Sequence, residues 1–334
     1  DESRYRKFTV PSKYIKHDRS ILGATPINYT VVVPLGTEVP LMTLMDMVEE
    51  SFRVFLEMGY APVYKEFLPV ILARPLGADS EYDCSFYYQS NNHYAVLEVN
   101  ADKMTEAHLP DLKMAIGRAV YRMVIFSYTY DPHYPNMVPP DQRTHEWLVQ
   151  ASVTWAEQFF VPEAERDHYV PADFTGDEQS PFAGMQAGIN SGSGSHAAKV
   201  RRHGYAMAAM IDMLSGAFDS VLPNGPAIRV IHEGLGTRPG PSRHPVGAVS
   251  AVAPPQNWWW AFLDSYLLND IYVGVRGPFV VPEVMDGEFT IASDDDTLKT
   301  WTDTYPDLSA RRYRVNLEHM QIAESAALEF KLIN

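Results

Sequence analysis

The chain has 334 residues, a formal net charge of −15 and one cysteine, Cys84. Such an acidic surface disfavours nucleic acid and anionic lipid, so neither is expected as a partner. A single cysteine excludes an internal disulfide and cysteine-rich metal sites, and no apolar run has the length of a membrane span, so membrane insertion is not expected. The chain is long enough for a large core and for more than one domain.

The first hundred residues predict a small α/β unit. Residues 1–22 are polar and charged and are expected to be irregular. After Pro40 the apolar spacing predicts an amphipathic helix, which Gly59 is expected to end. Four strands are predicted from their β-forming residues, at 28–33, 69–73, 86–88 and 94–99. Along the last of these, residues 94–99, the character of the side chains alternates, which predicts an edge strand of the sheet.

Two long helices follow, joined by a loop that is too rich in proline to be helical. Residues 112–128 carry apolar side chains at the spacing of one buried helical stripe. Residues 146–160 carry a second such stripe, and the loop lies at 130–140. This helix pair is the most informative part of the sequence.

Residues 147–157 read Trp-Leu-Val-Gln-Ala-Ser-Val-Thr-Trp-Ala-Glu. This segment resembles the second active-site helix of gluzincin-type zinc metallopeptidases from secreted bacterial proteins, which reads Trp-Leu-x-Glu-Gly-x-Ala-x-Trp-x-Glu. In that family the preceding helix carries His-Glu-x-x-His. The resemblance implies a zincin-like α+β fold with a small N-terminal mixed sheet and a mostly helical second half. It also implies a secreted, periplasmic or cell-surface location. A short C-terminal β segment is predicted from the β-forming residues beyond about residue 272.

In such a fold the last strand before the first active-site helix lies along the cleft and binds extended peptide by strand addition. The resemblance gives this place to residues 94–99, so Tyr94 and Val96 are candidate partner-binding residues.

The groups that hold zinc in the resembling family are replaced here. Gly117 and Tyr121 stand at the two His positions, Arg118 at the catalytic Glu and Gln150 at the third ligand, while Glu157 is retained. Glycine has no side chain, a phenol keeps its proton near neutral pH, a neutral amide is a poor zinc ligand and arginine brings a fixed positive charge. We therefore expect no zinc, no other cofactor and no zinc-dependent hydrolysis.

Without an ion, the buried polar groups of Arg118, Tyr121 and Gln150 are expected to form a hydrogen-bonded cluster. Glu157, with Arg118 facing it, is expected to be an ion-pair or cap partner and not an acid catalyst. The alternative is that the two segments are simply packed core helices and that the resemblance is accidental.

The second half predicts further helices at 204–214, 228–232 and 258–268, with a strand as the alternative at 228–232. Short strands are predicted at 272–281, 288–291, 312–316 and 327–333. Three adjacent tryptophans, Trp258, Trp259 and Trp260, cannot all point inward, so at least one is expected to meet another domain, a ligand or solvent. The predicted domains are an α/β subdomain at 1–110, a helical subdomain at 111–271 and a β-rich segment at 272–334.

Three functions are compatible with these residues. The first is an inactive zincin-like protein, or pseudopeptidase, that binds a protein or peptide. The second is a hydrolase, a peptidase or glycosidase, that uses relocated residues, namely Asp131, His133, His145 and Glu157. The third is an adhesion or surface-assembly component whose C-terminal β segment makes the contact. The sequence carries no signal for an oligomeric state.

Overall fold

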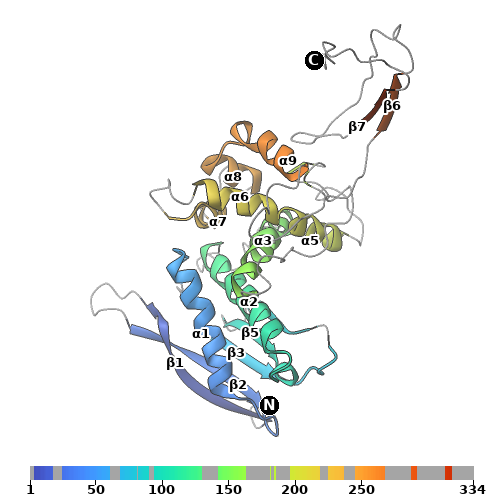
Figure 1. Cartoon of the computed structure of the whole chain (residues 1–334). Coiled ribbons are helices and arrows are strands. Elements are labelled where there is room, and N and C mark those ends of the chain that lie inside the picture. Colours follow the sequence, from blue (N-terminus) through green and yellow to red (C-terminus); the bar gives the residue numbers. More distant parts are fainter. Residues whose placement is uncertain are drawn as a thin grey trace.

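The computed structural model describes residues 4–17, 25–60, 68–80, 82–89, 94–129, 142–162, 181, 184–185, 196–218, 225–236, 245–267, 287–291 and 313–317. Within these residues a mixed sheet from the first hundred residues is followed by a mostly helical part (Figure 1). The predicted α+β fold class is thereby confirmed.

The sheet has five strands: β1 (Tyr5–His17), β2 (Thr25–Pro34), β3 (Leu68–Arg74), β4 (Cys84–Gln89) and β5 (Tyr94–Asn100). Their order is β1-β2-β3-β5-β4, with β2, β3 and β5 parallel and both outer strands antiparallel to their neighbours. The edges are therefore β1 and β4. The prediction that residues 94–99 form an edge is wrong, because β5 pairs on both sides and its residues are buried from Ala95 onward.

The prediction that residues 1–22 are irregular is also wrong for β1. Phe8 and Val10 pack against the core, while Lys7 and Thr9, which alternate with them, are exposed. This alternation with period two is that of a strand with one solvated face. The many charges of an edge strand concealed the pattern.

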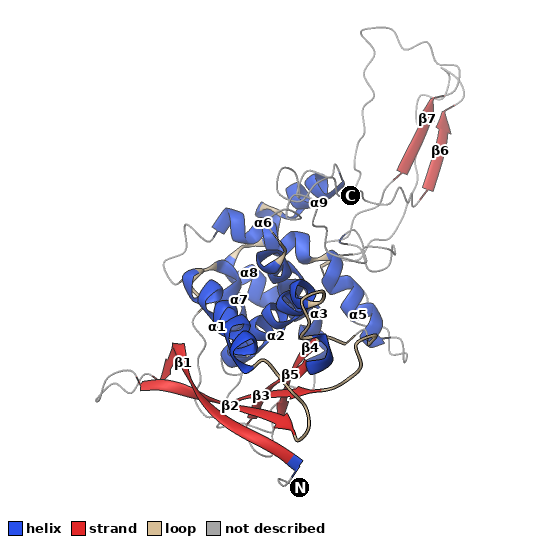
Figure 2. Cartoon of the chain, turned by 60° about the horizontal axis from the view of Figure 1, so that its bottom comes forward, coloured by secondary structure: helices blue, strands red, loops and turns tan. Residues whose placement is uncertain are grey.

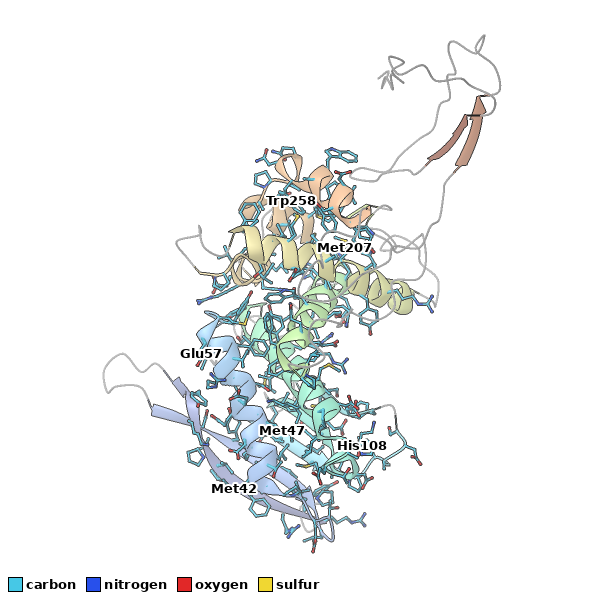
Figure 3. The ribbon with its side chains drawn as sticks, in the orientation of Figure 1. Met42, Met47, Glu57, His108, Met207 and Trp258 are labelled. Atoms are coloured by element: carbon cyan, nitrogen blue, oxygen red, sulfur yellow. The ribbon has the colours of Figure 1, made fainter. Side chains whose placement is uncertain are left out.

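Helices α1 (Leu41–Glu57) and α2 (Leu109–Thr129) lie on one face of the sheet (Figure 2). On α1, Met47 is buried and Met42 is exposed, as expected for an amphipathic helix (Figure 3). The predicted end at Gly59 is confirmed: its φ of +90° lies in the left-handed region, and the Tyr60 N–H donates to the Phe55 carbonyl.

The remaining helices form a second layer around α3 (Gln142–Glu157), which continues as a short 3-10 helix, Gln158–Phe160. They are α5 (His196–Ala206), α6 (Ala208–Phe218), α7 (Ala227–Gly236), α8 (Pro245–Val252) and α9 (Trp259–Leu267). The predicted helix at 204–214 is in fact two helices, with a break at Met207. Met207 and Trp258 both lie in this layer (Figure 3), and α3 packs against α2, α5 and α6.

Strands β6 (Gly287–Ile291) and β7 (Tyr313–Leu317) pair in parallel as a separate two-stranded sheet. They confirm the strands predicted at 288–291 and 312–316. The strands predicted at 272–281 and 327–333 lie outside the described residues. The boundaries of the three domains remain a prediction. Among the described helices, none combines the length and the apolar character that crossing a membrane requires.

Candidate functional site

Helices α2 and α3 pack side by side in opposite directions. The Nη1 atom of Arg118 lies 3.0 Å from Oε1 of Glu157, near the end of α3, and Nη2 of Arg122 lies 2.5 Å from Oε1 of Glu146, near its start. Residues later in α2 therefore contact residues earlier in α3. The two segments that resemble active-site helices do meet in space, and the ion pair predicted between Arg118 and Glu157 is confirmed.

Gly117 lies directly against the ring of Phe160, which follows α3. A Cβ atom at position 117 would be 2.2 Å from Cδ2 of Phe160, far inside van der Waals contact. The ring is itself buried, so it has little room to move. No side chain fits at this position while Phe160 keeps its place.

Tyr121 is fully buried in an aromatic cluster. Its ring centroid is 4.7 Å from that of Phe55, 5.3 Å from that of Tyr60 and 6.1 Å from that of Trp155. These distances are typical of tilted and edge-to-face aromatic pairs. The position that the resemblance assigns to a second metal ligand thus belongs to the apolar core between α1, α2 and α3.

Gln150 is buried under α5. A Cβ atom at Gly204 would lie 2.5 Å from Cβ of Gln150, so only glycine allows the two helices to approach this closely. The Gln150 amide donates to Oγ1 of Thr154, 3.2 Å away on the same helix. The hydrogen-bonded cluster expected of Arg118, Tyr121 and Gln150 is therefore not formed, because each side chain is held by other partners.

The ion pair of Arg118 lies at the edge of this packed region. The Arg118 side chain is 39% exposed and that of Glu157 is 13% exposed. Burial lowers the pKa of the Arg118 guanidinium, but the charge and hydrogen bond of Glu157 outweigh burial, so the pKa is raised overall. The guanidinium stays charged throughout the physiological pH range.

These residues do not fit the zinc ion that the resemblance implies. Zinc needs three nitrogen or oxygen ligands that converge on one point and leave a position open for water. Phe160 fills the space beside Gly117, Tyr121 is packed among rings and Gln150 is covered by α5. Elsewhere in the described part of the chain, no three His, Cys, Asp or Glu side chains are grouped so that they could hold a metal.

Sequence reasoning missed an accessible stripe on α2. Between residues 114 and 128, every side chain is buried except four at a spacing of four residues: Met114, Arg118, Arg122 and Phe126. Residues four apart lie on one side of a helix. The signal was present in the sequence as two arginines four residues apart in an otherwise apolar helix. We call these four residues the α2 stripe.

The α2 stripe runs beside the edge strand β4. The Phe126 ring is 5.4 Å from that of Phe86 and 5.1 Å from that of Tyr88, which lie toward the end of β4. At the start of the strand, Cys84 lies close enough to Arg118 for the guanidinium charge to act on the pKa of the thiol. The helix and the edge strand therefore run in the same direction. Cys84 itself is buried, which raises the pKa of its thiol and makes the thiolate unfavourable.

Of the predicted partner-binding residues, few are placed to meet a partner. Val96 is buried in the interior strand β5, and Tyr94 is half-buried on the same strand. Trp258 and Trp259 are buried, whereas Trp260 is 59% exposed. The expectation that at least one tryptophan faces outward is confirmed, but only Trp260 has substantial exposed surface.

The hydrolase alternative loses part of its basis. Asp131 and His133 lie outside the described residues. His145 and Glu157 are twelve positions apart on α3, which separates them by about 18 Å along the helix axis. They are too far apart to act on one bond, and Glu157 is already paired with Arg118.

A buried polar contact lies on another side of α3. Nε2 of His232, on α7, is 3.0 Å from Oγ of Ser152, and both residues are fully buried. Burial, followed by the charge of His145, lowers the pKa of His232 to about 3. His232 is thus a neutral core residue at physiological pH.

No family model and no curated protein matches the chain. Among solved structures, an aminopeptidase N family protein from Idiomarina loihiensis matches with a TM-score of 0.46 and 10% identity, over 83% of this chain and 47% of that one. An M1 zinc metallopeptidase from Deinococcus radiodurans matches with a TM-score of 0.39 and 12% identity, over 84% and 53%. The chain spans about half the length of these structures, which belong to the gluzincin class that the helix pair resembles.

Proposed function

We propose that the chain is a catalytically inactive zincin-like protein that binds an extended segment of a protein or peptide. The observation that carries the first half of this proposal is the contact between Gly117 and Phe160. A ring 2.2 Å from the place of a Cβ atom excludes any ligand side chain at that position. In this proposal, packing as well as the change of ligand residues takes the place that the zinc pocket has in an active metallopeptidase.

The binding half of the proposal is supported by β4 and the α2 stripe. Among the described residues β4 pairs only with β5, so its other side offers backbone N–H and C=O groups to an extended segment. The partly exposed side chains of α2 lie next to it. A strand added here would thus form main-chain hydrogen bonds with β4 and would contact the accessible side chains of α2.

Metal analysis tests the loss of catalysis. Protein purified without chelator is expected to contain far less than one zinc per chain and to leave aminopeptidase and endopeptidase substrates uncleaved, with an authentic zinc metallopeptidase as the positive control. One zinc per chain that is lost in both Tyr121→Phe and Gln150→Leu would show that the two positions are ligands after all.

A screen of extended peptides tests the binding. Peptides that bind are expected to lose affinity when alternate backbone nitrogens are methylated, because strand addition depends on main-chain hydrogen bonds. The same peptides methylated at the intervening nitrogens serve as matched controls. Equal affinity of both methylated forms would contradict strand addition.

A further inference from the structure

The α2 stripe contains two guanidinium groups with unused hydrogen-bonding capacity. Arg118 makes one hydrogen bond, from Nη1 to Glu157, and Arg122 makes one, from Nη2 to Glu146. A guanidinium has five N–H donors, and within the described part of the chain the others of these two groups have no acceptor. Both side chains are about one-third exposed, at 39% and 30%. Each guanidinium can therefore donate further hydrogen bonds to a carboxylate of a ligand.

The spacing of these arginines matches an extended chain. Four residues of helix separate Arg118 from Arg122 by about 6 Å along the axis. Side chains on one face of a strand are two residues apart, which is about 7 Å. Because α2 and β4 run in the same direction, a strand added to β4 would run along the stripe. The side chains on its helix-facing side would then be spaced at nearly the same interval as the two arginines.

We propose that the site formed by β4, Arg118 and Arg122 selects extended segments with acidic side chains at alternating positions, Asp/Glu-x-Asp/Glu. This inference rests on the proposed binding function and names its ligand class. Arginine is suited to this task because its planar fork binds carboxylates through paired hydrogen bonds. The apolar ends of the stripe, Met114 and Phe126, favour apolar residues on either side of the acidic pair.

The two glutamates of α3 compete with such a ligand. Glu157 accepts one hydrogen bond from Arg118, and Glu146 accepts one from Arg122. The negative charges of the two glutamates repel an incoming carboxylate. Replacing either glutamate by glutamine removes this charge and is expected to tighten binding several-fold. If the arginines served only to join α2 to α3, the same replacement would leave peptide affinity unchanged.

Fluorescence anisotropy with short labelled peptides tests the inference. The peptides have amidated C-termini, so that the only carboxylates are on side chains, and they compare Glu-x-Glu with Gln-x-Gln and with two adjacent glutamates. The Glu-x-Glu peptide is expected to bind at least tenfold more tightly than either, and added salt is expected to weaken it. R118Q and R122Q are each expected to lower its affinity about tenfold.

R53Q is the matched control, because Arg53 on α1 is also ion-paired to two glutamates, Glu50 and Glu57, and is partly exposed. It is expected to bind like the unaltered chain, and thermal unfolding of each variant checks that it is folded. The inference is overturned if the chain binds Glu-x-Glu and Gln-x-Gln with equal affinity, or if R118Q, R122Q and the unaltered chain bind Glu-x-Glu equally well. Either result leaves the proposed peptide binding intact. Binding of none of the peptides overturns both.

Discussion

Two neighbouring sides of α2 have opposite characters. Gly117 and Tyr121 lie one turn apart and are fully packed, against Phe160 and against an aromatic cluster. Arg118 and Arg122 lie one position further along and are accessible, charged and only partly paired. A helix turns by about 100° per residue, so adjacent positions face different surroundings. Thus the positions that the resemblance assigns to metal ligands are packed in the core, while the neighbouring side of the helix is accessible to solvent and charged.

The tryptophans at the start of α9 show the same contrast, and the largest effect on the free energy of unfolding is expected here. Trp259 is fully buried and Trp260 is 59% exposed. Trp259→Ala is expected to lower the free energy of unfolding by about 3–5 kcal/mol, because it removes a large core side chain and leaves a cavity. Trp260→Ala is the control and is expected to change it by less than about 0.5 kcal/mol. Urea unfolding measures both, and similar losses would contradict the difference in burial.

The packed side of α2 can be tested at Gly117. Gly117→Ala is expected to destabilise the chain by about 2–3 kcal/mol, because its methyl group would overlap the ring of Phe160. Gly216, in α6, has open space where its Cβ would lie, and Gly216→Ala is expected to stabilise the helix by about 0.5–1 kcal/mol. Opposite signs in urea unfolding would confirm the close approach. A stabilised Gly117→Ala variant would mean that Phe160 is not where the structure places it.

Helix α3 also has two kinds of polar contact, and the buried one is sensitive to acid. The pKa of His232 is about 3 in the folded chain, against about 6.5 for an unperturbed histidine. Between these values the unfolded chain binds a proton that the folded chain does not, so stability falls as the pH falls. Between pH 6 and pH 4 the loss is expected to be roughly 2 kcal/mol.

His232→Gln removes the titration while keeping a polar group near Ser152, so its stability is expected to depend less on pH over this range. His108, which is only half-buried near the start of α2, provides the matched variant His108→Gln. That variant controls for the replacement of a histidine as such. The same slope in all three proteins would show that other groups cause the loss.

The sequence predicted the two long helices through helical periodicity. It predicted the α+β class through the order of its elements and the resemblance, and the ion pair of Arg118 with Glu157 through the places that the resemblance gives to these two opposite charges. It did not predict that Phe160 fills the space at Gly117 or that Gly204 lies over Gln150. Both contacts join residues far apart in the chain, and a glycine alone does not identify its neighbour. The error at β5 has a similar cause, since a short apolar run does not reveal which strand will pair beside it.

The accessible side of α2 gives the smallest expected effect on stability. Arg118→Gln removes an ion pair whose arginine is 39% exposed, and solvent screens such pairs strongly. The loss is therefore expected to be about 1 kcal/mol or less in urea unfolding, and to shrink as salt is added. Arg53→Gln removes a comparable pair on α1 and is expected to behave in the same way. A loss of several kcal/mol for Arg118 alone would show that it supports the α2–α3 packing, which would weaken its assignment as an anchor for ligands.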